Sequence, residues 1–239
     1  MNVLPSQILF SLAATLNEHF PMKIIVGLIT IVTVTNFSNQ RLPFNPCITA
    51  TQTDTASPLV PFFDDFNDNT NSWTIADDKN LRCRIDSGFY YLTAVGHAYG
   101  EAQEVKIDSR KDFEIEARIK ILSGNSDHKN YYSMMFWGRE AMDGYYFTFA
   151  KDGFASVETC DGKNQSDCIT KSGSLQKTTL NPDEFNVYMI RKTSRTYSFF
   201  VNGTKFYEMP FAPFYGNLIG FGAGRKVSLA IDYLKVNYL

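Results

Sequence analysis

Phe113-Glu-Ile-Glu-Ala-Arg-Ile-Lys-Ile121 decides the fold of this chain. Apolar and charged side chains alternate along the whole segment. This alternation is typical of a strand in a sheet that buries one face and exposes the other to water. After residue 60 no stretch of useful length has the periodicity of an amphipathic helix. The sequence therefore predicts an all-β domain built from antiparallel strands.

Further short strands are expected at regular spacing as far as the C-terminus. Two turns separate them most clearly, Lys151-Asp-Gly153 and Asn202-Gly203. An Asn-Gly pair favours a two-residue hairpin turn because both positions need positive φ. Many short, evenly spaced strands are typical of a sandwich or a barrel. The predicted strands are 89–93, 102–107, 113–122, 132–139, 145–150, 154–159, 185–192, 197–201, 204–208, 218–223 and 227–237.

The composition limits the partners of the chain. Its 239 residues carry a formal net charge of −2, and no basic stripe is present. Nucleic acids and anionic membrane surfaces attract clustered positive charge, so neither is expected as a partner. Aromatic residues make up 15% of the chain, and in a domain of this size some of these rings reach the surface.

The N-terminal region reads as a targeting segment. Met22-Lys23 precedes an apolar run that extends to Val34, which is the length and charge pattern of a signal peptide. The alternative is a membrane anchor over residues 20–37. Translation could begin at Met1 or at Met22, and both starts stay open. We predict an exported protein, either secreted or held in the cell envelope.

Three regions follow from these patterns. Residues 1–40 form the export signal or anchor, and residues 41–60, rich in Pro, Thr and Ser, form a linker. Residues 61–239 form the β-domain.

Four cysteines are compatible with disulfides in an exported chain. Cys160 and Cys168 bracket a polar, turn-rich loop, and we predict a bridge between them. Cys47 with Cys83 is a second candidate pair. No C-x-x-C pair or cluster of histidines supports metal binding by these cysteines.

Several segments together resemble the concanavalin A-like (laminin G-like) jelly-roll superfamily, over about residues 60–239. They are Phe63-Asp-Asp-Phe66 with Trp73, the strand from Phe113 to Arg118, Met134-Met-Phe-Trp137, Gly144-Tyr-Tyr-Phe-Thr-Phe149, the hairpin from Phe199 to Thr204, and Ile231-Asp-Tyr-Leu-Lys-Val236. The resemblance implies a two-sheet antiparallel β-sandwich of the jelly-roll type. Members of the superfamily include sugar-binding modules, glucanases and a branch of 3-keto-disaccharide hydrolases.

We expect a non-catalytic, lectin-like module that holds an oligo- or polysaccharide on its concave sheet. One alternative is an enzyme, either a glycoside hydrolase or a 3-keto-glycoside-cleaving relative. The other is a structural adhesion or assembly module, whose partner would be an envelope protein.

Glu114 and Glu116 are the candidate catalytic residues. Two acids at i and i+2 on a strand point the same way, about 7 Å apart. The resemblance implies that glucanases carry their catalytic pair at the ends of an E-x-D-x-E strand. Arg118 stands here where the third acid would be, which argues against that mechanism. The alternative is a solvated face on which Arg118 and Lys120 balance the acids.

A sugar platform is predicted from Trp137, Arg139, Tyr146 and Glu116. If Met134, Phe136, Phe147 and Phe149 are core residues, the alternation places the platform residues together on the outer, concave sheet. An indole ring can cover the apolar surface of a sugar, and charged groups can bind its hydroxyls. The alternative is that Trp137 packs under a loop and Arg139 pairs with Glu140 or Asp143.

A structural Ca²⁺ site is predicted from Asp64, Asp65 and Asp232. The first and last strands of a jelly roll pair side by side, so these carboxylates could share a cation. The alternative is local hydrogen bonding and turn capping. No other cofactor is expected.

Overall fold

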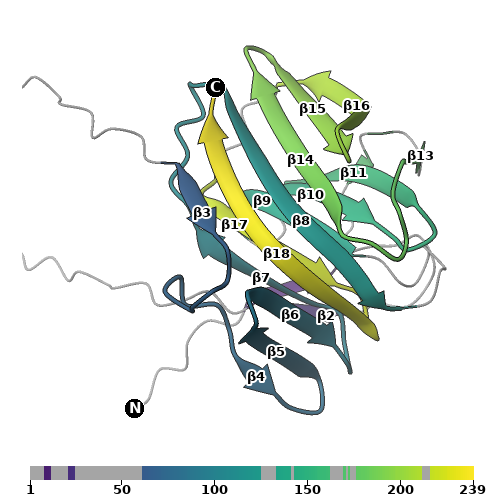
Figure 1. The fold of residues 1–239 in the computed structure, drawn as a ribbon. Helices are drawn as coiled ribbons and strands as arrows, with labels where there is room; N and C mark the ends of the chain where they lie inside the picture. Colours follow the sequence, from purple (N-terminus) through teal and green to yellow (C-terminus); the bar gives the residue numbers. More distant parts are fainter. Residues whose placement is uncertain are drawn as a thin grey trace, which may run out of the picture.

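The protein is described by a computed structural model. It covers residues 8–11, 21–24, 61–124, 133–140, 143–161, 169–170, 172, 176–211 and 216–239. All described regular elements are strands, and they form two sheets. Figure 1 looks onto one sheet, which we call sheet B, with the other, sheet A, behind it. The predicted two-sheet antiparallel β-sandwich is confirmed.

Sheet A has the strand order β1-β2-β7-β17-β9-β10-β11-β12, with β13 also paired to β11. Its strands are β1 (Ile8–Ser11), β2 (Pro21–Ile24), β7 (Tyr99–Glu104), β9 (Ser133–Glu140), β10 (Asp143–Phe149), β11 (Phe154–Asp161), β12 (Ile169–Thr170), β13 (Gln176–Lys177) and β17 (Leu218–Ala223). All pairs are antiparallel except a single parallel bridge between β2 and β7.

Sheet B has the order β16-β15-β14-β8-β18-β6-β5-β4, with β3 also paired to β18. Its strands are β3 (Phe62–Asp64), β4 (Ala76–Asp77), β5 (Leu81–Asp86), β6 (Phe89–Ala94), β8 (Phe113–Ser123), β14 (Asn186–Thr193), β15 (Thr196–Val201), β16 (Thr204–Pro210) and β18 (Val227–Tyr238). The long strands β8 and β18 lie side by side at its centre.

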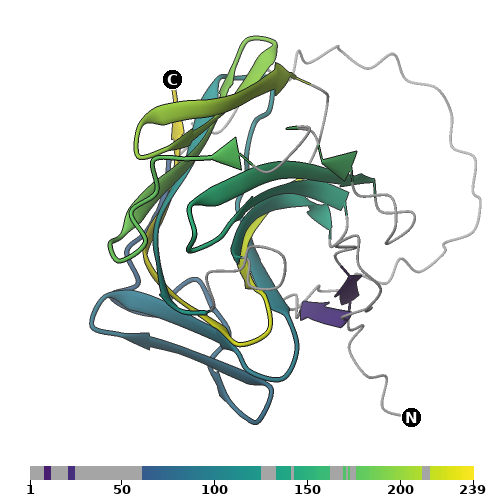
Figure 2. The same ribbon diagram turned by 90° about the vertical axis from the view of Figure 1, so that its right-hand side faces the viewer.

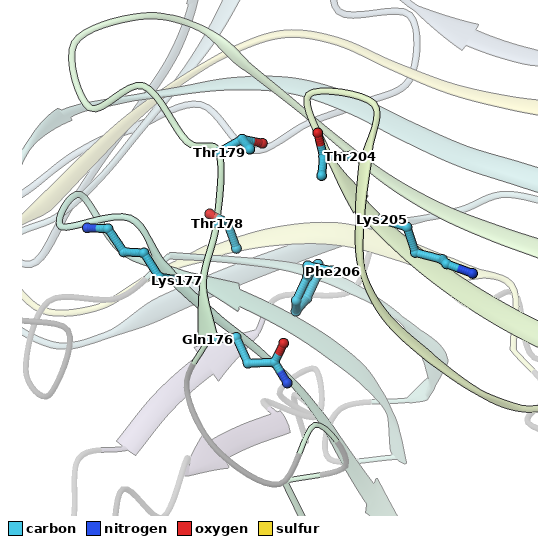
Figure 3. Close-up of a pocket in the computed structure, with 7 residues that line it drawn as sticks. All are labelled: Gln176, Lys177, Thr178, Thr179, Thr204, Lys205 and Phe206. Atoms are coloured by element: carbon cyan, nitrogen blue, oxygen red, sulfur yellow. The ribbon is translucent and has the colours of Figure 1, made fainter.

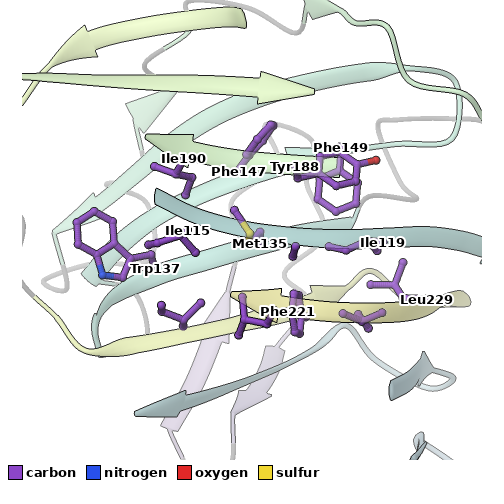
Figure 4. Close-up of a cluster of buried hydrophobic side chains, with 14 of the residues drawn as sticks. Ile115, Ile119, Met135, Trp137, Phe147, Phe149, Tyr188, Ile190, Phe221 and Leu229 are labelled. Atoms are coloured by element: carbon purple, nitrogen blue, oxygen red, sulfur yellow. The ribbon is translucent and has the colours of Figure 1, made fainter. Parts of the chain in front are cut away.

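The layer between the two sheets is the hydrophobic core (Figure 4). Ile115 and Ile119 of β8 enter it from sheet B, and Phe147 and Phe221 enter it from sheet A, all with 0–1% of their surface exposed. The alternation that predicted a buried face for Phe113–Ile121 is therefore confirmed. Burial of apolar surface on this scale is the main favourable contribution to folding.

The register between β9 and β10 corrects one predicted part of the core. The sequence analysis placed Phe136 in the core together with Phe147, but the register partner of Phe147 is Met135. Met135 and Phe147 both belong to the core cluster, whereas Phe136 does not. Phe136 therefore points to the face of sheet A that is turned away from sheet B, which we call the outer face of sheet A. A difference of one residue in register moves every side chain of a strand to the opposite face.

The predicted hairpin at Asn202-Gly203 is confirmed. Both residues have positive φ, 50° and 74°. The side chain of Asn202 is also fully engaged, because its amide donates to the carbonyl of Thr179 and to Asn186 Oδ1, and its oxygen accepts from the amide of Val187. Asn202 is thus a structural residue that ties the hairpin to its neighbours.

Strand β5 was not predicted, although its sequence carries the signal. Leu81 and Cys83 are buried while Arg82 and Arg84 are exposed, which is the same period-2 pattern that identified β8. The run is short and half of its residues are charged, so its composition resembles that of a loop. Only the alternation of buried and exposed positions identifies it as a strand.

The predicted N-terminal regions are largely untested by the structure. Residues 25–60, which include Cys47, lie outside the described residues. Within the described part of the chain, no helix is long and apolar enough to cross a membrane.

Replacing Ile119 by alanine should destabilise the domain strongly. Ile119 is fully buried between the sheets, so Ile119→Ala removes buried methyl groups and leaves a cavity, at a cost of about 2–5 kcal/mol. Leu122 lies on the same strand but is 42% exposed, and Leu122→Ala should change the stability by only about 0.5 kcal/mol. Chemical denaturation of both variants measures the difference. Equal effects would contradict the two-layer core.

Candidate functional site

Trp137 is a core residue and not a surface platform, which corrects the prediction. Its side chain is 1% exposed. The indole stacks on Tyr145 with ring centroids 5.7 Å apart and meets Phe113 edge-on at 5.3 Å. Its Nε1 donates a hydrogen bond to the carbonyl of Gly216 at 3.0 Å. A buried indole needs such a partner, so both ends of the side chain serve the fold.

The other three predicted platform residues lie apart from one another. Arg139 is exposed and pairs with Asp143, with Nη2 and Oδ2 2.7 Å apart, which is the predicted alternative. Glu116 belongs to β8 and faces outward from sheet B. Tyr146 alone faces outward from sheet A, the sheet whose curvature is visible in Figure 2.

Both candidate catalytic acids are paired with cations, and Glu116 also with a phenol. Glu116 accepts from the hydroxyl of Tyr233 and contacts Nζ of Lys235, each at 2.7 Å. Glu114 forms an ion pair with Arg191. Both acids therefore belong to a charge-balanced outer face of sheet B, but their partners are Arg191 and Lys235 rather than the predicted Arg118 and Lys120.

The three acids proposed for Ca²⁺ are also engaged elsewhere. Asp64 accepts from Trp73 Nε1 at 2.7 Å and from the backbone amide of Phe66 at 3.0 Å. Asp65 bonds to Asn67, and Asp232 pairs with Arg118. No group of three or more potential metal ligands exists among the described residues. Local hydrogen bonding accounts for Asp64 and Asp65, as in the predicted alternative, and an ion pair between strands β8 and β18 accounts for Asp232. The Ca²⁺ site itself stays a prediction.

Of the two predicted disulfides, one stays untested and the other is contradicted. Cys160 is buried in β11, but Cys168 lies outside the described residues, so the bridge between them stays a prediction. Cys83 is a free thiol and is buried. The predicted pairing of Cys83 with Cys47 is therefore wrong.

The outer face of sheet A gathers a different set of residues. Phe136 and Tyr146 are register partners on β9 and β10, and their rings lie 5.1 Å apart. The outer face of a sheet ordinarily carries polar side chains, so two large rings there are unusual. Both rings are almost fully covered in the full chain, with 3% and 1% of their surface exposed.

Glycines make room for the ring of Phe136. Gly138 and Gly144 are register partners one step along the same face. A Cβ added at Gly138 would lie 2.6 Å from Cζ of Phe136, and one at Gly144 would also collide with the ring. The ring thus occupies the space that a Cβ would need at either position, which explains why the two strands have glycine there.

A chain of hydrogen bonds runs beside these rings. Thr148 Oγ1 and Ser156 Oγ are 2.5 Å apart across β10 and β11, and Ser156 Oγ donates to Glu158 Oε1 at 3.3 Å. Glu158 is the register partner of Tyr146, so the acid and the aromatic pair share one face. Burial raises the pKa of Glu158, and the Ser156 hydroxyl opposes part of that rise.

The described residues that neighbour Glu158 on this face are not acids. Its cross-strand partners are Tyr146 and Thr170, and the nearest same-face residues of β11 are Ser156 and Cys160. A retaining glycosidase needs two carboxyl groups about 5–5.5 Å apart. These described neighbours therefore provide one carboxylate together with hydroxyl and aromatic groups, which suits binding rather than paired acid–base chemistry.

A second buried acid, Glu101, lies in the interior and not on the outer face of sheet A. It is 2% exposed and accepts from the hydroxyl of Tyr90 and from the amide of Thr74, each at 2.5 Å. Burial raises the pKa of Glu101, although these hydrogen bonds oppose part of the rise. Burial likewise raises the pKa of the neighbouring thiol of Cys83 to about 12. This cluster joins β5, β6 and β7 inside the sandwich and is structural.

The residues that prediction missed carried a weak signal. Strands β9 and β10 are apolar on both faces, so alternation could not say which rings point inward. In Ser156-Val-Glu158 two polar residues flank an apolar one, which is the pattern of an ordinary exposed strand face. The pattern alone therefore does not mark Glu158 as a functional residue. Only the register across β9, β10 and β11 brings Phe136, Tyr146 and Glu158 together.

Comparison with known proteins places the fold. No protein-family model and no curated protein matches the chain. Among solved structures, a β-1,3-1,4-glucanase (lichenase) from a mouse hindgut metagenome is similar, with 10% identity over 75% of this chain and 99% of that one and a TM-score of 0.54. The β-glucanase of Bacillus licheniformis is 10% identical over 74% of this chain and 97% of that one, with a TM-score of 0.51.

The chain has the concanavalin A-like jelly-roll fold. A structure from work on endo-acting O-glycanases of the human gut microbiota shares it, with 15% identity over 74% of this chain and 98% of that one and a TM-score of 0.52. The concanavalin A-like resemblance stated from the sequence is thereby confirmed at the level of the fold.

Removing the carboxylate of Asp64 should destabilise the domain without any effect of metal. Asp64→Ala leaves the Trp73 indole N–H and the Phe66 amide unpaired, at a cost of about 2–4 kcal/mol. Asp65→Ala is the control, since its bonds to Asn67 are exposed. Denaturation midpoints measured with Ca²⁺ and with a chelator should coincide for each protein. A midpoint that falls on chelation only when Asp64 is present would instead support the cation site.

The stability of the protein should depend on pH through Glu101. Because burial raises its pKa above the ordinary value of 4.5, the folded state binds the proton more tightly than the unfolded state. The free energy of unfolding should then decrease as pH rises from about 4.5 through the folded pKa. Glu101→Gln, which stays neutral, should show a smaller decrease, and Glu158 accounts for part of the remainder. Denaturation curves across this pH range test the prediction, and an unchanged slope contradicts it.

Proposed function

We propose that the protein binds carbohydrate on the outer face of sheet A. The observation that carries the proposal is the juxtaposition of the Phe136–Tyr146 ring pair with the Thr148–Ser156–Glu158 hydrogen-bonded chain. Rings can cover the apolar C–H surface of a sugar, and a carboxylate with hydroxyls can bind its O–H groups. The concanavalin A-like fold, which solved glucanases share, supports the same ligand class.

Binding without hydrolysis is the form that the contacts favour. The described neighbours of Glu158 on this face supply no second carboxylate, and a glycosidase of the usual kind uses two. The raised pKa of Glu158 would suit a general acid, so hydrolysis is the second function to be tested. The variants described below test binding and hydrolysis together.

Access to the rings is part of the proposal. Phe136 and Tyr146 are almost fully covered in the full chain. Strands β1 and β2, which extend sheet A beyond β7, fall within residues 1–40, the segment that the sequence predicts to be an export signal or anchor. We infer that the protein is exported and that removal of this segment gives sugar access to the two rings. The form lacking the segment would then be the one that binds sugar.

Replacing the acid should weaken sugar binding. Glu158→Gln keeps the size of the side chain but removes the charged acceptor, and one charge-assisted hydrogen bond corresponds to about tenfold or more in affinity. Glu114→Gln makes the same change on the outer face of sheet B and should leave the affinity within about twofold. Screening on a glycan array followed by calorimetry with the best oligosaccharide gives the affinities.

Two further measurements make the test decisive. Tyr146→Ala should also weaken binding, with Tyr91→Ala on sheet B as its matched control, and thermal denaturation checks that each variant is folded.

A cleavage site placed within residues 41–60 allows binding to be measured before and after removal of the N-terminal region, and affinity should rise on cleavage. No binding to any glycan by either form, or equal affinity for Glu158→Gln and Glu114→Gln, would refute the proposal. Release of reducing sugar that Glu158→Gln abolishes would establish hydrolysis instead.

A further inference from the structure

A second concavity lies on a different part of the molecule. Two walls enclose a pocket of about 300 Å³, one formed by residues 176–179 and the other by residues 204–206 (Figure 3). The first wall begins with β13, which pairs with β11 of sheet A, and the second belongs to β16, at one end of sheet B. The pocket is therefore a slot between the margins of the two sheets. Its volume is at the lower end of the range for small-molecule sites.

One wall of the slot is held rigidly from both sheets. The amide and the hydroxyl of Thr178 both donate to the carbonyl of Gly153, at 2.9 and 3.0 Å. The hydroxyl of Thr179 donates to the carbonyl of Val201 at 3.0 Å, and the amide of Asn202 donates to the carbonyl of Thr179. A wall fixed in this way loses little conformational entropy when a ligand binds.

The hydroxyls of this wall are left as acceptors. Thr178 and Thr179 have each used their O–H hydrogen on a backbone carbonyl, and a hydroxyl oxygen keeps lone pairs for an incoming donor. A ligand that matches them must itself carry O–H or N–H groups.

Phe206 supplies an apolar surface beside these hydroxyls. Its ring stacks on Phe147 of the core with centroids 5.2 Å apart. The side chain is only partly buried, and it lies between the two walls (Figure 3). One side of the ring is thus anchored in the sandwich while the rest of the side chain borders the slot.

The charges nearby do not select an anion. Lys177 and Lys205 point away from the slot in opposite directions (Figure 3). Lys177 donates to the carbonyl of Asp152, and Lys205 pairs with Glu208 at 2.6 Å. Neither ammonium group is directed at the slot, so a neutral ligand fits better than a carboxylate or a phosphate.

We propose that this slot between β13 and β16 is a second binding site, and that it takes a single neutral sugar residue. Such a ligand combines hydroxyl donors for Thr178 and Thr179 with a C–H face for Phe206. The site is separate from the outer face of sheet A and does not depend on Glu158. Its affinity is millimolar, as expected for a ligand with the size of one sugar ring.

The test uses the full chain and methyl glycosides of glucose, galactose and mannose as probes. Addition of a probe should shift the backbone amide signals of Thr178, Thr179 and Phe206 in NMR spectra, with saturation in the millimolar range. Methyl glucuronide should bind no better than its neutral counterpart. Shifts confined to other residues, or a clear preference for the glucuronide, would overturn the assignment.

Two variants and a control separate this site from the proposed function. Thr204→Trp fills the slot and should abolish the shifts, whereas Thr193→Trp, on an exposed strand end, should preserve them. Phe206→Leu keeps an apolar side chain and should weaken binding several-fold. Glu158→Gln should leave monosaccharide shifts at the slot unchanged while it weakens oligosaccharide binding. Oligosaccharide binding lost in Glu158→Gln with no shifts at the slot refutes this inference alone, and the reverse result refutes the outer-face proposal alone.

Discussion

The pairing of Tyr145 with Trp137 is the constraint on which both the core and the candidate site depend. It places these two rings, with Met135 and Phe147, between the sheets. The residues between them in sequence, Phe136 and Tyr146, must then face the other way. Because neighbouring strands share their faces in register, β11 and β17 follow the same division, and the outer face of sheet A is fixed along its whole width.

Two local features hold this register. The Trp137 indole finds its hydrogen-bond acceptor in Gly216 only when it points inward. On the opposite face, Gly138 and Gly144 leave space for the ring of Phe136. A shift of one residue would turn the Trp137 indole away from its acceptor and would separate the Phe136 ring from the glycine pair that makes room for it, and both changes cost free energy.

The sequence was sufficient for β8, whose outer face is charged, although the same pattern in β5 was overlooked. In β8 the alternation of isoleucines with Glu and Arg identified strand, face and core together, and the Asn202-Gly203 turn was identified from its need for positive φ. In β9 and β10 both faces are apolar or aromatic, so the pattern contains no information about orientation. The predicted sugar platform failed for that reason: it combined Trp137 from the core with Glu116 from the opposite sheet.

The acids show how surroundings, rather than residue type, separate structural groups from candidate functional ones. Glu114 and Glu116 have cationic partners on the outer face of sheet B, so their charge is already balanced and little is left to bind a ligand. Asp64 is used by the Trp73 indole and a backbone amide. The described partner of Glu158 is one hydroxyl, that of Ser156.

Strand β11 connects the two proposed binding places. Its residues Ser156 and Glu158 form part of the outer face of sheet A, while Phe154 and Ala155, at its start, pair with β13 and so support one wall of the slot. Residues three positions apart on a strand are about 10 Å apart along it. The two places therefore lie close together, one on the outer face of sheet A and the other between the margins of the two sheets. Sites carried by paired strands keep their geometry better than sites on free loops. A sugar polymer that contacts both places would have to bend around the margin of sheet A, which makes independent binding of short saccharides the simpler expectation.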